Sequence, residues 1–107
     1  MPMYISLVSF TEEGIKSVKE TGRRAEAFAQ KVKKKGITIK NTFWTIGSYD
    51  IVHIFEAPDC NAAATVAFAL SSMGNVRTQT MRAFDLKEVT DIVEDVYELH
   101  LDKGALQ

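Results

Sequence analysis

The sequence is poor in the residues that mark disulfide-rich, membrane-spanning and strongly charged proteins. Its one cysteine, Cys60, cannot form an internal disulfide. No apolar run approaches the roughly 20 residues that a membrane-spanning helix needs. The formal net charge is only −1, whereas a general nucleic-acid binder needs clustered, uncompensated lysine and arginine. With no signal peptide before the first strand, we expect a cytoplasmic protein whose partners include neither nucleic acid nor membrane.

Motifs for metal, nucleotide and nucleophile chemistry are also absent. The two histidines, His53 and His100, are far apart in the chain and lack cysteine or carboxylate neighbours at metal-ligand spacing. The sequence contains no Walker loop, dinucleotide fingerprint or nucleophile elbow. Cys60 has no helper histidine adjacent in the sequence. We therefore predict no metal and no cofactor, and catalytic residues stay unknown.

What the chain does contain is one regular alternation of strands and helices in a single domain of 107 residues. Hydrophobic periodicity predicts four strands, over residues 3–10, 37–46, 50–57 and 76–84. It predicts a helix from Thr11 to about residue 35, in which Thr21-Gly22 either introduces a kink or restarts the helix with Thr21 as a second cap. A second helix follows Asp59 and ends near residue 73, and a third covers about 86–100, opened by an Asp85–Glu88 capping box.

The order β-α-β-β-α-β predicts a ferredoxin-like α+β sandwich (core about 3–85) with an extra C-terminal helix. The strands at 3–10 and 50–57 carry apolar residues on both faces, so both sides of the sheet need a cover. The helices cover one side, and the C-terminal helix covers part of the other at most. We therefore expect a second subunit there, giving a homodimer that forms a dimeric α/β barrel, or a higher homo-oligomer.

A glycine turn, Gly47-Ser48, separates the two central strands and indicates a hairpin. With Gly47-Ser48 as a two-residue loop, Thr42 faces His53 and Trp44 faces Ile51. A four-residue loop would change these partners but keep the same residues on one face. Lys40 and Phe55 share that face. We predict that this face lines the space between the sheet and a partner subunit, where Trp44, His53 and Thr42 orient a small organic ligand. The alternative is that Trp44 fills a subunit interface and His53 makes a local hydrogen bond.

Five further residues are candidate ligand contacts: Tyr49, Asp50, Arg77, Thr78 and Arg82. Arg77, Thr78 and Arg82 lie on the most polar strand, which reads as an edge strand. Their guanidinium and hydroxyl groups suit a carboxylate or phosphate, although either arginine is equally suited to an ion pair with Asp50, Glu56 or a carboxylate of the next subunit. Asp50, beside Tyr49, is either a general base or an acceptor of backbone hydrogen bonds that hold the turn.

Several ordered blocks of the chain resemble the GYD-domain family of small bacterial and archaeal proteins. The residues that carry the resemblance are Gly47-Ser48-Tyr49-Asp50, Thr11 to Lys16, Arg23 to Phe28, Glu56 to Asp59 and Ala69 to Phe84. The resemblance implies a ferredoxin-like, oligomeric domain whose biochemical role is not established. His53 and Cys60 stand where the family pattern leads us to expect an aliphatic and an acidic residue, so neither is carried over as a family function.

Three functions are consistent with this sequence. The first is a sensor or binding module that holds a small organic molecule between the sheet and a partner subunit. The second, by analogy of fold alone, is a cofactor-independent enzyme like the monooxygenases and isomerases built on dimeric α/β barrels. The third is a structural or regulatory subunit that docks another protein.

Overall fold

Four antiparallel strands form one sheet in the order β2-β3-β1-β4. The computed structural model describes residues 1–101, and the strands are β1 (Met3–Phe10), β2 (Thr38–Trp44), β3 (Ile51–Glu56) and β4 (Val76–Ala83). β2 and β4 are the edge strands, as predicted for β4. Together with the β-α-β-β-α-β order, this arrangement confirms the predicted ferredoxin-like α+β fold.

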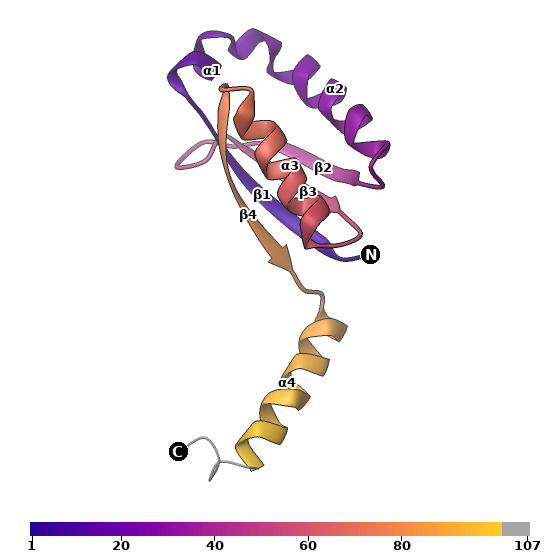
Figure 1. The fold of residues 1–107 in the computed structure, drawn as a ribbon. Coiled ribbons are helices and arrows are strands. Elements are labelled where there is room, and N and C mark those ends of the chain that lie inside the picture. Colours follow the sequence, from indigo (N-terminus) through magenta and orange to yellow (C-terminus); the bar gives the residue numbers. More distant parts are fainter. Residues whose placement is uncertain (102–107) are drawn as a thin grey trace.

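Two of the helices cover one side of this sheet. The helical elements are α1 (Glu12–Lys16), a 3-10 turn η1 (Val18–Glu20), α2 (Thr21–Lys33), α3 (Cys60–Ser72) and α4 (Leu86–Leu101). Figure 1 shows α2 and α3 lying over the sheet, while α4 continues beyond β4 and away from it. The expectation that the C-terminal helix covers part of the opposite sheet face is therefore wrong. That helix stands apart.

The core lies between the sheet and the two covering helices. Tyr4 of β1 and Phe55 of β3 are register partners whose rings stack with centroids 5.5 Å apart. Phe28 and Val32 of α2 close over them. The other buried members of this cluster are Ile37, Ala57, Ala63, Val66 and Leu70. Burial of this apolar area at about 25 cal/mol per Å² is the main stabilising contribution of the domain.

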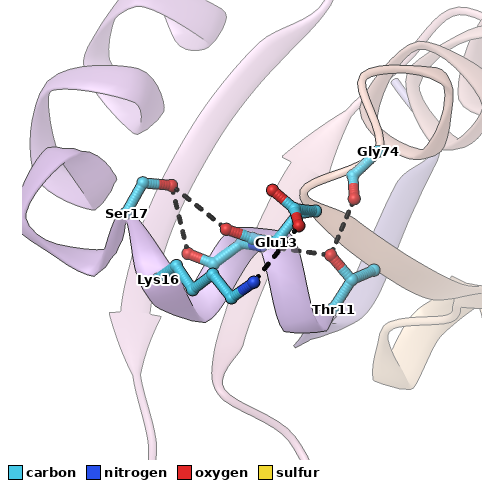
Figure 2. A network of polar contacts seen from close by, with 6 residues as sticks. Thr11, Glu13, Lys16, Ser17 and Gly74 are labelled. Carbon is cyan, nitrogen blue, oxygen red and sulfur yellow. Dashed lines mark hydrogen bonds and ion pairs between the residues drawn. The ribbon is translucent and has the colours of Figure 1, made fainter.

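The first helical segment is broken earlier than the sequence indicates. Thr11 caps α1 as predicted, because its Oγ1 accepts from the Gly14 N–H at 3.1 Å, and it also donates to the Gly74 carbonyl at 2.7 Å (Figure 2). The chain then leaves the α-helix at Ser17 and forms η1. Thr21 does not act as a second cap, because α2 starts at that residue without a side-chain cap.

The central hairpin keeps the predicted pairing but not the predicted turn. Thr42 faces His53 and Trp44 faces Ile51, as expected. The strands, however, end at Trp44 and resume at Ile51, and the Thr45 N–H donates to the Asp50 carbonyl at 2.8 Å. The prediction of a two-residue turn at Gly47-Ser48 is therefore wrong. The loop length is still even, and so the shared faces survive.

A β-bulge in β2 changes the place of Lys40. The register shifts between Ile39 and Asn41, and Ile39 rather than Lys40 lies opposite Phe55. Lys40 instead forms an ion pair with Glu56, with Nζ and Oε1 3.2 Å apart. The prediction that Lys40 shares the face of Thr42 and His53 fails because a bulge adds one residue to a strand and breaks the alternation.

Candidate functional site

A row of polar side chains crosses the helix-covered face of the sheet. Its members are register partners on the four strands: Thr42 on β2, His53 on β3, Ser6 on β1 and Thr80 on β4. The row is joined in pairs, since Thr42 Oγ1 lies 2.9 Å from His53 Nδ1 and Ser6 Oγ lies 2.7 Å from Thr80 Oγ1. Polar groups at this depth need such partners to offset their desolvation. The row therefore divides an otherwise apolar interior.

His53 is the titratable group of this row. Its side chain is buried, with 5% exposure, and the burial lowers the pKa of the imidazole below its ordinary value of 6.5. The ring is therefore neutral at pH 7. In that form one ring nitrogen donates and the other accepts, so the hydrogen bond to Thr42 leaves the second nitrogen for another partner.

Beside His53 lies a cavity of about 240 Å³ between the sheet and the covering helices. Val8 and Ile51 line it from the strands, and Phe28 and Leu70 line it from α2 and α3. Arg23, Arg24 and Lys31 line it from the α2 side. This combination of apolar walls with a few polar groups is that of a small-molecule site.

The structure moves the predicted pocket to the other side of the sheet. His53 and Thr42 share one face as expected, but that face lies under the helices of the same chain, and His53 lines their cavity. The prediction that this face is turned toward a partner subunit is wrong. The strand pattern could not decide this, because β3 is apolar on both faces and either one could have received the helices.

Trp44 does not enter this cavity. Its side chain is 47% exposed, and its Nε1 donates to Thr21 Oγ1 at 3.0 Å. The indole thus connects the end of β2 to the first residue of α2. This bond ties the hairpin to the helix layer.

The turn at Gly47-Ser48-Tyr49-Asp50 holds two strands together. Asp50 Oδ2 accepts from the Phe10 N–H at 2.8 Å, and the Asp50 N–H donates to the Val8 carbonyl at the same distance. Asp50 therefore fixes the end of β1 to the start of β3. The Tyr49 hydroxyl donates to Gln79 Oε1 of β4 at 2.8 Å. Both residues therefore hold the loop in place against the neighbouring strands.

A comparison with known protein families identifies the family of this chain. The sequence pattern of the GYD domain matches residues 4–93, which span the four strands, apart from Met3, and the first half of α4. The chain belongs to the GYD domain family. A relative from Thermus thermophilus, named "Glutamine synthetase and cystathionine beta-lyase binding protein", is 27% identical over 90 residues, covering 83% of this chain and 95% of the relative. No solved structure shows a significant match.

Three polar residues of β4 lie on two different faces of the sheet in this GYD domain. Thr78 lies opposite Val8 and Arg82 opposite Tyr4, on the helix-covered face, whereas Arg77 pairs with Ser9 on the other face. Arg82 stacks over the Phe84 ring, 4.4 Å from its centroid, and forms an ion pair with Glu88. Among the alternatives for Arg82 the structure thus shows an ion pair, but with the first turn of α4.

Glu88 is held by a hydrogen bond as well as by charge. The Arg82 guanidinium, together with the Asp85 N–H at 3.1 Å, lowers the pKa of the Glu88 carboxyl. The Glu88 N–H donates to Asp85 Oδ1 at 2.8 Å, which confirms the predicted capping box. The junction between β4 and α4 is therefore fixed by charge-assisted contacts rather than by apolar burial.

The surface of the domain opposite the helices is apolar and has no cover within residues 1–101. We call it the open face; its members are Met3, Ile5, Leu7, Phe43, Val52, Ile54 and Met81. α4 has an uncovered apolar face too, made by Leu86, Val89, Ile92, Val93, Val96, Tyr97 and Leu99, each exposed. Such surfaces mark interaction sites in proteins of this size.

The sequence prediction missed the basic residues at the cavity. Neither Arg24 nor Lys31 is among the site residues predicted from the sequence. The available signal was the spacing of Arg24, Phe28 and Lys31, which places two cations on the same helix face as a buried aromatic.

Within residues 1–101 no three His, Cys, Asp or Glu side chains gather to hold a metal ion. Over the same range, no helix is both long and apolar enough to cross a membrane. Cys60, at the start of α3, is exposed and free.

Proposed function

We propose that this protein is a binding module that docks onto other proteins, metabolic enzymes among them, through the apolar face of α4. The observation that carries the proposal is the exposure of this face along a 16-residue helix. A helix of this length is marginal in water when nothing packs against it. A partner that buries the face therefore stabilises the helix and gains affinity from the same contacts.

The pattern of α4 fits recognition of a helix by a groove. Val89, Ile92, Val93 and Val96 recur at intervals of three and four, the spacing of anchors in that mode. The opposite side carries mainly acids: Asp91, Glu94, Asp95 and Glu98. The partner surface expected from this chemistry is an apolar groove edged by lysine and arginine.

The relative from Thermus thermophilus supports enzymes as the partners, because its name states that it binds two of them. We therefore test glutamine synthetase and cystathionine β-lyase, purified from the organism that makes this chain, by surface plasmon resonance against the immobilised full chain. We expect saturable binding of at least one enzyme. It should weaken as salt screens the acidic side of α4.

A matched pair of variants locates the binding surface. Ile92→Glu places a charge in the apolar face, and Thr90→Glu adds the same charge to the same helix outside the anchor series. We expect Ile92→Glu to weaken binding about 100-fold or more and Thr90→Glu to retain it. Binding of neither enzyme, or equal binding by both variants, would contradict the proposal.

The open face has a different proposed occupant, a second copy of this chain. A face with apolar side chains from all four strands is complementary to itself, and a two-fold axis would bring two such faces together. This arrangement is the predicted dimeric α/β barrel. It leaves α4 free for other proteins.

Small-molecule binding is a second candidate function. It is supported by the cavity beside His53, which lies inside one chain and not between the sheet and a partner subunit. The enzyme alternative stays a prediction that these observations do not test.

A further inference from the structure

The cavity beside His53 has a size that suits a ligand of one ring or a short chain. Its volume is about 240 Å³, and an apolar cavity of about 150 Å³ is enough for benzene. Most of its wall is hydrocarbon, supplied by Val8, Phe28, Ile51, Leu70, Met73 and Val76. An apolar ligand of this size therefore gains free energy when its surface leaves water and contacts this wall.

The charges around the cavity are all of one sign. Arg23, Arg24 and Lys31 line it, and no aspartate or glutamate does within residues 1–101. Arg23 is already occupied, since its Nε lies 2.7 Å from Glu20 Oε2. Arg24 and Lys31 have no carboxylate partner in the described part of the chain. Two cations are thus available to an anion.

Arg24 is positioned before any ligand arrives. Its Nη1 donates to Ser17 Oγ at 2.9 Å, and Ser17, the residue that caps the C-terminus of α1, also lines the cavity. The break after α1 therefore places a hydroxyl where it orients the guanidinium. A guanidinium held in this way loses less conformational entropy when it binds a carboxylate through two parallel hydrogen bonds.

His53 supplies one more polar contact inside the same cavity. Thr42 occupies Nδ1, and Nε2 has no hydrogen-bond partner among residues 1–101. A ring nitrogen that lines a cavity without a protein partner can pair with an oxygen or N–H of a ligand. The cavity therefore presents cations on its α2 side and a neutral hydrogen-bonding group on the sheet.

We propose that this cavity binds a small organic acid, whose ring or short aliphatic chain contacts Phe28 and Leu70 and whose carboxylate pairs with Arg24 and Lys31. The inference rests on the second candidate function, small-molecule binding, and names the class of ligand. It is independent of α4 and of the open face. Recognition depends on the negative charge of the ligand more than on the shape of its apolar part.

The experiment compares acids with their amides, which have nearly the same shape without the charge. Benzoate, phenylacetate and hexanoate, each beside its amide, are titrated into the full-length protein by ligand-detected NMR. Backbone amide shifts map the site. We expect at least one acid to bind with a Kd of about 1 mM or tighter and to shift residues around the cavity. Its amide should bind about ten-fold or more weakly.

Variants assign the charge recognition to particular cations. Arg24→Gln should weaken the acid about ten-fold and leave its amide unchanged, whereas Lys33→Gln, on the same helix but outside the cavity lining, should change neither. An amide that binds as well as its acid would overturn the inference and leave the cavity as a site for neutral ligands. Absence of binding by all six probes would overturn both the inference and the small-molecule function.

Discussion

At the scale of single residues, Gly14 shows how a close approach selects an amino acid. A Cβ added to Gly14 would overlap the backbone carbonyl oxygen of Asn75, in the turn before β4. Gly22, in α2, has open space around the same position. The two glycines therefore have opposite roles, although both lie in helices and neither has a positive φ.

We predict that Gly14→Ala lowers the free energy of unfolding by about 2 kcal/mol or more, because backbone atoms must move to admit the methyl group. Gly22→Ala is the matched control. It should raise the free energy of unfolding by about 0.5–1 kcal/mol, because alanine is the better helix former. Urea unfolding of the two variants measures both effects, and a Gly14→Ala protein as stable as wild type would refute the close contact.

His53 links the stability of the fold to pH. Burial lowers the pKa of this imidazole in the folded state below 6.5, so the unfolded chain binds the proton more readily. The stability that depends on neutral His53 is fully present above pH 6.5. It is lost as the pH falls from there through the folded-state pKa.

We predict that wild type loses more stability than His53→Gln when the pH falls from 7.5 to 5.5. Glutamine does not titrate but can still hydrogen-bond to Thr42, and so the difference between the two proteins isolates the imidazole. Urea unfolding at the two pH values gives the comparison. Equal losses in both proteins would mean that His53 can take up a proton without penalty.

Asp50 and Trp44 illustrate two outcomes of residue-level reasoning. The bracing role of Asp50 is one of the two alternatives that the sequence offers, since a carboxylate at a strand start often accepts backbone N–H groups, and Phe10 supplies one. The partner of Trp44 could not be predicted. Thr21 is distant in the sequence and meets the indole only because α2 folds back over β2.

At the scale of elements, α4 is stabilised from its own first turn. The Asp85–Glu88 box satisfies two backbone N–H groups, and Arg82 holds Glu88 from the end of β4. Because the apolar face of α4 is uncovered within residues 1–101, these caps have a large share in keeping the helix formed.

We predict that Asp85→Ala speeds amide hydrogen exchange throughout α4 and leaves β1 unchanged. Loss of such a cap costs about 1 kcal/mol, which is much of what a lone helix of this length has. Asp95→Ala, in the same helix but away from the cap, is the control and should alter exchange little. Mass spectrometry resolves the two segments. Unchanged exchange in α4 would show that something else holds it.

At the scale of the whole molecule, the open face is the feature that one chain leaves incomplete. We expect the protein to sediment as a dimer. Phe43→Lys together with Met81→Lys should convert it to a monomer, because each copy would bury two charges in an apolar interface. Phe68→Lys, on the exposed side of α3, is the control and should leave the dimer intact. A wild-type monomer at all concentrations would refute the barrel.

Much of the fold followed from periodicity, caps and the order of elements. The capping residues Thr11, Asp59 and Asp85 mark the helix starts, and the β-α-β-β-α-β order leads to the observed sheet. The candidate site was predicted less well. Thr42 and His53 were paired correctly, but the side of the sheet was wrong, and Arg24 and Lys31 were missed.

By itself, the sequence determined the elements, their order and the pairing of the central hairpin, because caps and a two-residue period act over short distances along the chain. Only the tertiary structure decided which sheet face the helices cover, where the bulge displaces Lys40 and that α4 leaves the domain. The first of these outcomes depends on which of two apolar faces packs against the helices. Residues far apart in the sequence settle that competition together.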